Sequence, residues 1–161
     1  NLVNLISYKY KDIKLIHIST DGVYPSIKGN YKETSKLKPY NYYGKTKLKA
    51  EYIVKRLKNH LIIRTRFFNK NKIKFNTAAA DSFSSAIEVT KLVNIIKILI
   101  KKNVSGVLNV GEKKISDYLL YKKYKKKIKK CKRSEIQNKM SFKISIDASL
   151  NCDLLNKVMK K

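Results

Sequence analysis

The sequence predicts an α/β protein in which helices flank a parallel β-sheet. Short apolar runs with β-branched residues, at 14–18, 61–65 and 107–110, are typical of buried parallel strands. They alternate with two segments, 41–58 and 89–100, whose apolar residues recur every three or four positions, as in amphipathic helices. Strands that alternate with helices favour a parallel sheet. The 161 residues suffice for one compact unit.

The first third of the chain is predicted to hold the end of a helix at 2–11 and then the strand at 14–18. This strand stops at Ser19-Thr20-Asp21-Gly22. Residues 22–40 contain both prolines and two glycines among scattered polar residues, which is the composition of a long functional loop. The helix at 41–58 follows, with Lys and Glu residues at i, i+4 spacing on its surface.

The rest of the chain is predicted to continue the alternation of strands and helices. After the strand at 61–65, residues 66–86 are expected to form a second long loop before the helix at 89–100. Ser116 and Asp117 are suited to cap a helix that runs towards Cys131. A final short helix is expected at 150–159.

The chain is strongly basic, with 38 Lys and Arg residues against 11 Asp and Glu and a formal net charge of +27. Such a charge suggests nucleic acid or an acidic surface as a partner. Only four of the basic residues are Arg, however, and bidentate recognition of phosphates and guanines favours Arg. Lys, Ile, Asn, Tyr and Phe, all encoded by AT-rich codons, are abundant, so codon bias accounts for much of the charge. Nucleic acid is therefore not the expected partner.

The most basic segment, 122–133, has nine Lys or Arg residues in 12 positions. It could attract RNA or an anionic membrane. Apolar or weakly polar residues recur through it every three or four positions, at Leu120, Tyr124, Ile128 and Cys131. We therefore favour an amphipathic helix with a solvated Lys face.

The cysteine content and the hydropathy of the chain bear on metal binding, cellular compartment and membrane association. Cys131 and Cys152 lack metal-ligand spacing and a disulfide pattern, so no metal site is expected and a reducing cytoplasm is favoured. The longest apolar stretch, around 92–100, is much shorter than the ~20 residues of a membrane span, so no membrane association is expected. The chain begins at Asn1 and its only methionines are Met140 and Met159, so it is expected to be a fragment of a longer protein.

A possible catalytic constellation begins with Tyr43 and Lys47, four residues apart at the start of the helix at 41–58. This spacing places both side chains on one helix face. A tyrosine hydroxyl ordinarily keeps its proton at neutral pH, and a nearby ammonium stabilises the phenolate, so the pair could act as a general acid. Ser19 and Thr20 end a strand, at the usual ligand edge of an α/β sheet. The alternatives are a surface pair on a helix for Tyr43 and Lys47, and a local cap for Ser19 and Thr20.

An ordered set of segments resembles the extended short-chain dehydrogenase/reductases, and within them the dTDP-4-dehydrorhamnose reductase (RmlD-like sugar-nucleotide-binding) family. The segments are Ser19-Thr20-Asp21-Gly22-Val23-Tyr24, Gly29, Tyr31-Lys32-Glu33, Pro39, Tyr43-Gly44-Lys45-Thr46-Lys47-Leu48, Glu51 and Ile63-Arg64-Thr65. The resemblance is clear to about Thr65, weaker at 81–85 and 106–111, and slight beyond Ser116. Tyr-x-x-x-Lys alone is a weak signal, and the order of the segments makes it specific.

The resemblance implies catalytic roles for Tyr43, Lys47 and Thr20. Tyr43 would protonate the alkoxide as a hydride reaches a keto-sugar carbon, Lys47 would bind the nicotinamide ribose and tune Tyr43, and Thr20 would orient the carbonyl. The implied cofactor is NAD(P)H, which Ser19, Tyr43 and Lys47 would bind. The residues implied to touch the substrate are Thr20, Asp21, Phe67, Phe68 and Asn69.

The sequence departs from this family in its glycines. The family binds the cofactor pyrophosphate at a G-x-x-G-x-x-G turn after its first strand, where the backbone approaches the phosphates. This chain has five glycines, at 22, 29, 44, 106 and 111, and no three have that spacing. We therefore expect part of an NAD(P)-binding Rossmann fold without its first half, plus a small C-terminal substrate lobe. The expected domains are 1–65, the second half of the Rossmann fold with the Tyr-Lys helix, and 66–161, mainly the substrate lobe with interleaved Rossmann elements.

The resemblance implies that the complete protein reduces a nucleotide-linked 4-keto-sugar, in the synthesis of nucleotide sugars or polysaccharides. The 161-residue chain is expected to be inactive alone. Alternatives within the same fold are an NAD-dependent epimerase or dehydratase and a non-catalytic regulatory subunit. A nucleic-acid-binding module is a less favoured hypothesis. A nucleotide-sugar substrate and a homodimer are the expected partners.

Overall fold

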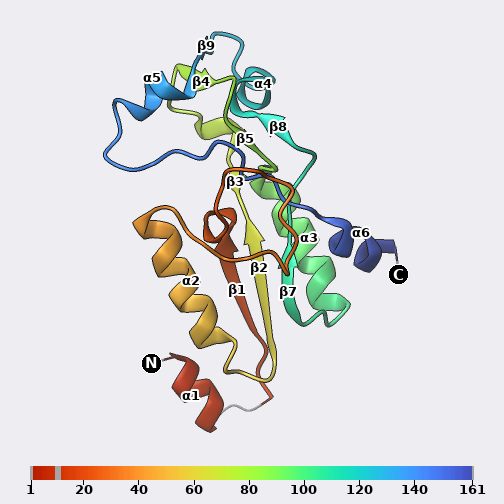
Figure 1. The fold of residues 1–161 in the computed structure, drawn as a ribbon. Coiled ribbons are helices and arrows are strands. Elements are labelled where there is room, and N and C mark those ends of the chain that lie inside the picture. Colours follow the sequence, from red (N-terminus) through yellow and green to blue (C-terminus); the bar gives the residue numbers. More distant parts are fainter. Residues whose placement is uncertain (1, 10–11, 161) are drawn as a thin grey trace.

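The centre of the molecule is a three-stranded parallel sheet in the order β1-β2-β7 (Figure 1). The computed structural model describes residues 2–9 and 12–160. The strands are β1 (Leu15–Thr20), β2 (His60–Thr65) and β7 (Gly106–Asn109). In the register of β1 with β2, Thr20 lies beside Thr65, so polar residues of both strands meet at their carboxyl ends. The predicted α/β class with a parallel sheet is confirmed.

Helices cover both faces of this sheet, with α2 on one side and α3 and α6 on the other (Figure 1). The longer helices are α1 (Leu2–Lys9), α2 (Tyr42–Val54), α3 (Val89–Lys101) and α6 (Asp153–Lys160). Successive side chains of a strand point to opposite faces. Leu61 and Ile63 of β2 accordingly share a buried apolar cluster with Leu92 and Leu99 of α3 and Leu155 of α6.

The ends of the predicted helices differ from the observed ones by a few residues. The Asn41 side chain caps α2 by accepting a 2.8 Å hydrogen bond from the Gly44 N–H, and the helix ends at Val54 rather than near residue 58. The final helix starts at Asp153, whose N–H donates to the Asn151 side chain at 3.0 Å. For the first predicted helix, residues 10 and 11 lie outside the described residues.

Short elements form a lobe beyond the carboxyl ends of β1 and β2 (Figure 1). They are β3 (Phe67–Phe68), η2 (Lys70–Lys72), β4 (Thr77–Ala79), β5 (Phe83–Ser84), β6 (Ile87–Glu88), β8 (Ile115–Ser116), α4 (Asp117–Lys122), β9 (Lys129–Cys131) and α5 (Arg133–Gln137). The pairs β3-β6 and β4-β9 are parallel, and β5-β8 is antiparallel. The predicted loop at 66–86 is therefore wrong in part, because strands of two or three residues are too short to show a periodic pattern.

The predicted helix from Ser116 to Cys131 is also wrong beyond its first turns. Ser116 caps α4 as expected, by accepting from the Leu119 N–H at 3.3 Å, but the helix ends at Lys122. Residues 129–131 instead form β9 against β4. The Lys125 ammonium donates to the carbonyl oxygens of Ile73 and Phe75, at 3.3 and 2.8 Å. Tertiary hydrogen bonds to the 73–79 segment thus replace the helix that the apolar spacing favours.

The long loop between β1 and α2 is held against the sheet by aromatic and backbone contacts. It begins with the 3₁₀ helix η1 (Asp21–Val23). The rings of Tyr24 and Tyr31 stack with their centroids 4.9 Å apart. Tyr31 also forms a β-bridge with Leu150, which ties the loop to the segment that leads into α6.

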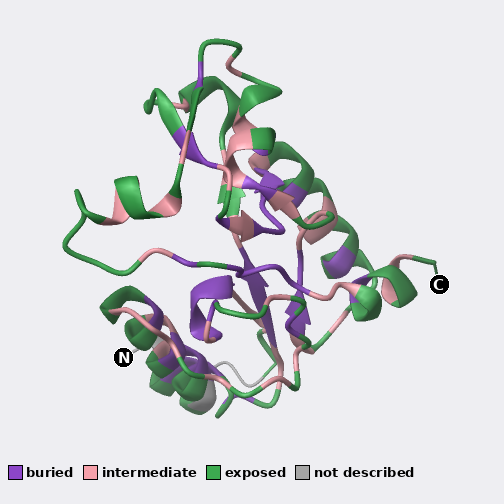
Figure 2. Ribbon diagram, turned by 45° about the horizontal axis from the view of Figure 1, so that its top comes forward, coloured by how far each residue is buried: buried purple, intermediate pink, exposed green. Residues whose placement is uncertain are grey.

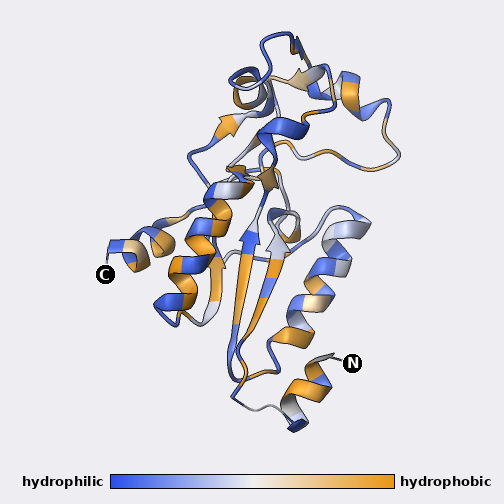
Figure 3. Ribbon diagram, turned by 180° about the vertical axis from the view of Figure 1, so that it is seen from behind, coloured by the Kyte–Doolittle hydropathy of each residue, from blue (hydrophilic) through white to orange (hydrophobic). Residues whose placement is uncertain are grey.

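Buried residues concentrate in the sheet and in the segments that cross its carboxyl end (Figure 2). Figure 3 shows that the strands are hydrophobic along most of their length and become more hydrophilic near their carboxyl ends. Polar residues therefore gather at the edge of the sheet that faces the lobe. Among the helices of the described residues, none is long and apolar enough to span a bilayer.

Candidate active site

The start of α2 lies directly against η1, and Gly44 makes this approach possible. A Cβ atom at Gly44 would collide with the Gly22 carbonyl oxygen and would lie 2.9 Å from Cβ of Pro39. The absence of a side chain therefore lets α2 touch the turn that follows β1. This contact brings the start of α2, with Tyr43, and the end of β1, with Thr20, to the same pocket.

A pocket of about 310 Å³ opens at this junction, at the carboxyl ends of β1 and β2. Its lining residues are Ser19, Thr20, Asp21, Gly22, Tyr40, Asn41, Tyr43, Thr65, Arg66 and Phe67. Five residues predicted for the site, from three separate segments of the chain, thus meet at one pocket: Ser19, Thr20, Asp21, Tyr43 and Phe67. Ligands of open α/β sheets bind at this edge.

Lys47 lies one turn further along α2 and contacts the sheet. Its Nζ donates a 2.6 Å hydrogen bond to the carbonyl oxygen of Ile18 on β1. An ammonium carries three N–H donors, so this bond leaves two for a ligand. Tyr43 is 59% exposed and lines the pocket.

Two residues predicted to touch the substrate, Phe68 and Asn69, lie outside the lining of this pocket. Phe68 packs into the lobe, with its ring centroid 5.7 Å from that of Tyr121 and 5.5 Å from that of Tyr124. The Asn69 side chain accepts a 2.9 Å hydrogen bond from the Asn71 N–H and so caps η2. Of the three neighbouring residues predicted to touch the substrate, Phe67, Phe68 and Asn69, only Phe67 lines the pocket.

The Ser19 hydroxyl is directed at a buried ion pair. Its Oγ donates to Oε1 of Glu51 at 2.5 Å, and Glu51 in turn binds Arg64 of β2. The Arg64 guanidinium also donates to the Tyr24 hydroxyl at 2.8 Å, and this hydroxyl donates to Oδ1 of Asn109 at 2.9 Å. The network therefore connects α2, all three strands of the sheet and the 22–40 loop.

Glu51, Arg64 and Arg66 are not among the residues predicted for the site. The signal for Glu51 is its position, eight residues after Tyr43 and four after Lys47, which places all three on one helix face. The signal for Arg64 is a charge inside an apolar strand, because such residues are seldom buried without a partner. For Arg66 we see no signal in the sequence, since it follows a strand as many surface residues do.

Thr20 and Asp21 form a short polar chain that reaches Arg66. The Thr20 Oγ1 lies 3.2 Å from Oδ1 of Asp21, and Oδ2 of Asp21 lies 2.8 Å from Nε of Arg66. Asp21 is only 3% exposed. Burial raises the pKa of Asp21, and the charge of Arg66 and the Thr20 hydrogen bond oppose this rise.

A second cavity, of about 360 Å³, lies within the lobe. Aromatic and aliphatic side chains, among them Phe75, Tyr121 and Ile136, form much of its lining, together with Asp117. Burial raises the pKa of Asp117, and the charge of Arg66 in the first pocket opposes the rise. The two hollows are therefore close enough to interact electrostatically through Asp117 and Arg66.

The residues present fit one end of a nicotinamide dinucleotide. Tyr43 and Lys47 offer a hydroxyl and two free ammonium N–H groups beside the carboxyl ends of the strands. A glycine-rich turn for the pyrophosphate is absent from the 161 residues. Among residues 2–9 and 12–160, no group of three or more His, Cys, Asp and Glu side chains is placed to hold a metal ion.

Comparison with known proteins identifies relatives of this arrangement. The family model described as "RmlD substrate binding domain" matches residues 7–94. A hypothetical dTDP-4-dehydrorhamnose reductase from Sulfolobus tokodaii has a crystal structure with a TM-score of 0.77 and 31% sequence identity, over 91% of this chain and 58% of that chain. A comparison with curated protein sequences found no significant match.

Two further crystal structures show the same fold. The dTDP-4-dehydrorhamnose reductase from Clostridium acetobutylicum has a TM-score of 0.78 at 20% identity, over 91% of this chain and 59% of that one. The one from Bacillus anthracis, in complex with NADP, has a TM-score of 0.74 at 22% identity, over 89% and 59%. The chain thus spans 58% to 59% of the length of these three proteins.

The parallel sheet and its flanking helices match part of the Rossmann-like fold of these reductases, one of which is in complex with NADP. The fold and the Tyr-x-x-x-Lys helix place the chain in a family of short-chain dehydrogenase/reductase type. Because the family model covers more than half of the sequence, the chain belongs to the RmlD substrate-binding-domain family.

Proposed function

We propose that this chain is the catalytic and substrate-side part of an NAD(P)H-dependent reductase acting on a nucleotide-linked 4-keto-sugar, in the synthesis of nucleotide sugars or polysaccharides. The observation that carries the proposal is the junction of Tyr43 and Thr20 at one pocket, with Lys47 one helical turn away. Family membership and the likeness to the Sulfolobus tokodaii structure support it.

The chemistry requires a hydride and a proton for the keto carbon and its oxygen. Bound NAD(P)H supplies the hydride. The Tyr43 phenol lines the pocket and donates the proton to the alkoxide oxygen as it forms. The ammonium of Lys47, anchored on the Ile18 carbonyl, holds the ribose hydroxyls with its remaining N–H groups and stabilises the phenolate that Tyr43 leaves behind.

The two hollows suit the two parts of a nucleotide sugar. The polar pocket, with hydroxyl groups of Thr20, Tyr40 and Tyr43, accommodates the sugar ring. The lobe cavity offers the rings of Phe75 and Tyr121, against which a base can stack. This division is part of the proposal and accounts for a lobe that lies over the carboxyl edge of the sheet (Figure 1).

The 161 residues are not expected to catalyse this reaction alone, because they contain only the nicotinamide end of the cofactor site. Titration calorimetry with NADH and NADPH should therefore detect no binding by this chain at micromolar concentrations. Micromolar binding would show that another pocket in these residues holds the cofactor.

The decisive experiment supplies the missing part of the cofactor site. We define the completed protein as a fusion in which a glycine-rich first half of a Rossmann fold precedes Asn1. It should bind NADH or NADPH and oxidise it in the presence of dTDP-4-dehydrorhamnose or a related 4-keto-sugar nucleotide. Cofactor binding without turnover of any such substrate would instead favour a non-catalytic subunit of the same fold.

A further inference from the structure

Thr20 has a single hydroxyl proton, and the structure shows where it points. A threonine hydroxyl provides one donor and two acceptor lone pairs. The Thr20 Oγ1 accepts from the Gly22 N–H at 3.1 Å and lies 3.2 Å from Oδ1 of Asp21. An ionised carboxylate only accepts, so Thr20 donates its proton to Asp21. In this state the hydroxyl offers the pocket a lone pair and no proton.

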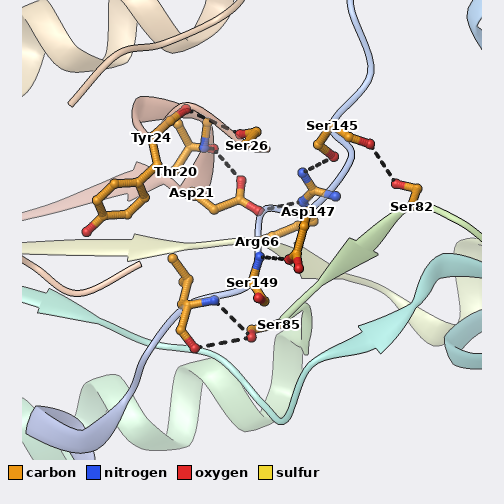
Figure 4. A network of polar contacts seen from close by, with 12 residues as sticks. Thr20, Asp21, Tyr24, Ser26, Arg66, Ser82, Ser85, Ser145, Asp147 and Ser149 are labelled. Carbon is orange, nitrogen blue, oxygen red and sulfur yellow. Dashed lines mark hydrogen bonds and ion pairs between the residues drawn. The ribbon is translucent and has the colours of Figure 1, made fainter. Parts of the chain in front are cut away.

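Arg66 forms an ion pair with the other oxygen of the Asp21 carboxylate. Its Nε lies 2.8 Å from Oδ2 of Asp21, and its Nη2 donates to the Ser145 hydroxyl at 3.3 Å. Ser82 in turn donates to the Ser145 carbonyl oxygen at 3.1 Å. Figure 4 shows this chain of contacts from Thr20 through Asp21 and Arg66 to Ser145 and Ser82. The pocket residue Thr20 is thereby linked to the 144–149 segment, which crosses over the site.

We propose that Asp21 is the positioning residue of Thr20 and that Arg66 controls the protonation state of Asp21. When Asp21 is ionised and paired with Arg66, the Thr20 hydroxyl is a hydrogen-bond acceptor towards the pocket. When Asp21 is protonated, the Thr20 hydroxyl becomes a donor towards the pocket. This inference rests on the proposed function. A protonated Asp21 can donate to Thr20 Oγ1, which frees the Thr20 proton for the keto oxygen. The site then has one arrangement for binding the ketone and another for binding the alcohol.

The groups around this pair come from several elements. Asp21 belongs to η1, and Arg66 follows β2. Tyr40 from the loop before α2, and Asp117 and Tyr121 from α4, also interact electrostatically with Arg66. The carboxylates of Asp21 and Asp117 thus both interact electrostatically with the guanidinium of Arg66.

The burial of these groups favours the neutral form of the carboxyl groups. Burial raises the pKa of Asp21 and of Asp117, and Arg66 opposes both rises. Burial also raises the pKa of Tyr40 and Tyr121, so both phenols are neutral when the carboxyl groups titrate. The pair of carboxyl groups can therefore take up a proton under conditions in which an exposed aspartate would remain ionised.

The expected pH dependence follows from the direction of the Thr20 hydrogen bond. Ketone reduction needs a donor to the oxygen that becomes negative, so kcat for reduction should fall as pH rises through the titration of Asp21. Oxidation of the alcohol needs an acceptor, so its rate should rise through the same step. The rates of reduction and oxidation should therefore change in opposite directions with pH and share one midpoint. A general loss of structure at low pH would instead lower both rates.

The test uses three variants of the completed protein, assayed in both directions from about pH 4 to about pH 9. Arg66→Gln removes the charge that favours ionised Asp21, so the shared midpoint should rise by about 1–3 pH units. Arg66→Lys keeps a positive charge and should restore most of the parent profile. Asp21→Asn cannot titrate, so the pH-dependent change in rate assigned to Asp21 should disappear in both directions.

A matched control is Lys91→Gln, which breaks the exposed ion pair of Lys91 with Glu112. Its pH profile should superimpose on that of the parent. If Arg66→Gln also left the midpoint in place, or if Asp21→Asn kept the step, the assignment of Asp21 and Arg66 would be overturned.

A measurement that needs no turnover separates this inference from the proposed function. In the 161-residue chain labelled with ¹³C-aspartate, the Asp21 carboxyl resonance, identified by its loss in Asp21→Asn, should titrate at a higher pH in Arg66→Gln than in the parent. A raised midpoint supports the inference even if the completed protein turns over no keto-sugar. An unchanged midpoint contradicts it even if reduction is observed.

Discussion

Glu51 of α2 and Arg64 of β2 form a buried bidentate ion pair beneath the candidate active site. Nε of Arg64 lies 3.0 Å from Oε1 of Glu51, and Nη2 lies 2.7 Å from Oε2. The two side chains are 0% and 1% exposed. Because Tyr43, Lys47 and Glu51 share one face of α2, this pair fixes the rotation of the helix that carries the proposed acid and its lysine.

Glu51→Gln should destabilise the chain strongly, because it leaves the Arg64 charge buried without its carboxylate. Removal of one partner of a buried pair typically costs about 3–5 kcal/mol. Urea unfolding of the 161-residue chain would measure the change in the free energy of unfolding. The control is Glu112→Gln, which breaks the exposed ion pair with Lys91 and should have little effect. Equal stability of the two variants would show that the buried pair does not anchor α2.

Gly44→Ala should separate α2 from the turn after β1. Its new methyl group would collide with the Gly22 carbonyl oxygen and crowd Pro39. The expected loss of stability is about 1–3 kcal/mol, even though alanine favours a helix by about 1 kcal/mol over glycine. The completed protein should also lose turnover, because Tyr43 moves away from Thr20.

Gly22→Ala serves as the matched control for Gly44→Ala. A Cβ atom at Gly22 would have its nearest contacts with Thr20 at 3.5 and 3.6 Å, which are ordinary van der Waals distances. The free energy of unfolding should therefore stay near that of the parent. If both glycine variants behaved alike, close approach at Gly44 would not be what positions the helix.

Cys152 should react slowly with alkylating reagents. Burial raises the pKa of its thiol to about 11, and only the thiolate is nucleophilic. At pH 8 the thiolate fraction would then be of the order of one in a thousand. Mass spectrometry after timed treatment with iodoacetamide would measure the modified fraction of Cys152, with a small thiol peptide as the reference. Modification as fast as that of the peptide would contradict the burial of this thiol.

The sheet and the helices around it could be predicted from the sequence because their patterns are long. Three apolar strands and the helices α2 and α3 each span several repeats of their own period, and the structure contains all of them. The lobe could not be predicted in this way. Its strands contain two or three residues, and their pairing, such as that of β4 with β9, depends on segments about 50 residues apart.

The pocket could be predicted only in part. Tyr43, Thr20 and Asp21 belong to motifs with recognisable spacing, and the structure brings them together. Arg66 is brought to the same pocket by the path of the chain after β2, which no local pattern reveals. The predicted helix at 122–133 is wrong. Hydrogen bonds from Lys125 to residues 73–76 stabilise a different backbone conformation more than the local apolar periodicity stabilises a helix.

Lys47→Ala in the completed protein should impair both cofactor binding and rate. The variant removes the ammonium that rests on the Ile18 carbonyl and faces the proposed ribose site. We therefore expect a weaker dissociation constant for NADPH in calorimetry together with a lower kcat. Lys45→Ala, in the same turn of α2 but exposed, is the control and should resemble the parent. A loss confined to kcat, with cofactor affinity unchanged, would remove the ribose-binding role.

Tyr43 is proposed to deliver the proton to the reduced keto-sugar, and Tyr43→Phe removes this proton donor. The measurement is kcat for NADPH oxidation by the completed protein with its best 4-keto-sugar nucleotide, alongside the dissociation constant for NADPH. We expect kcat to fall by about 10²- to 10⁴-fold, since a general acid is lost, while NADPH binding is nearly unchanged. A kcat close to that of the parent would contradict this role of Tyr43, because the proton would then come from another group.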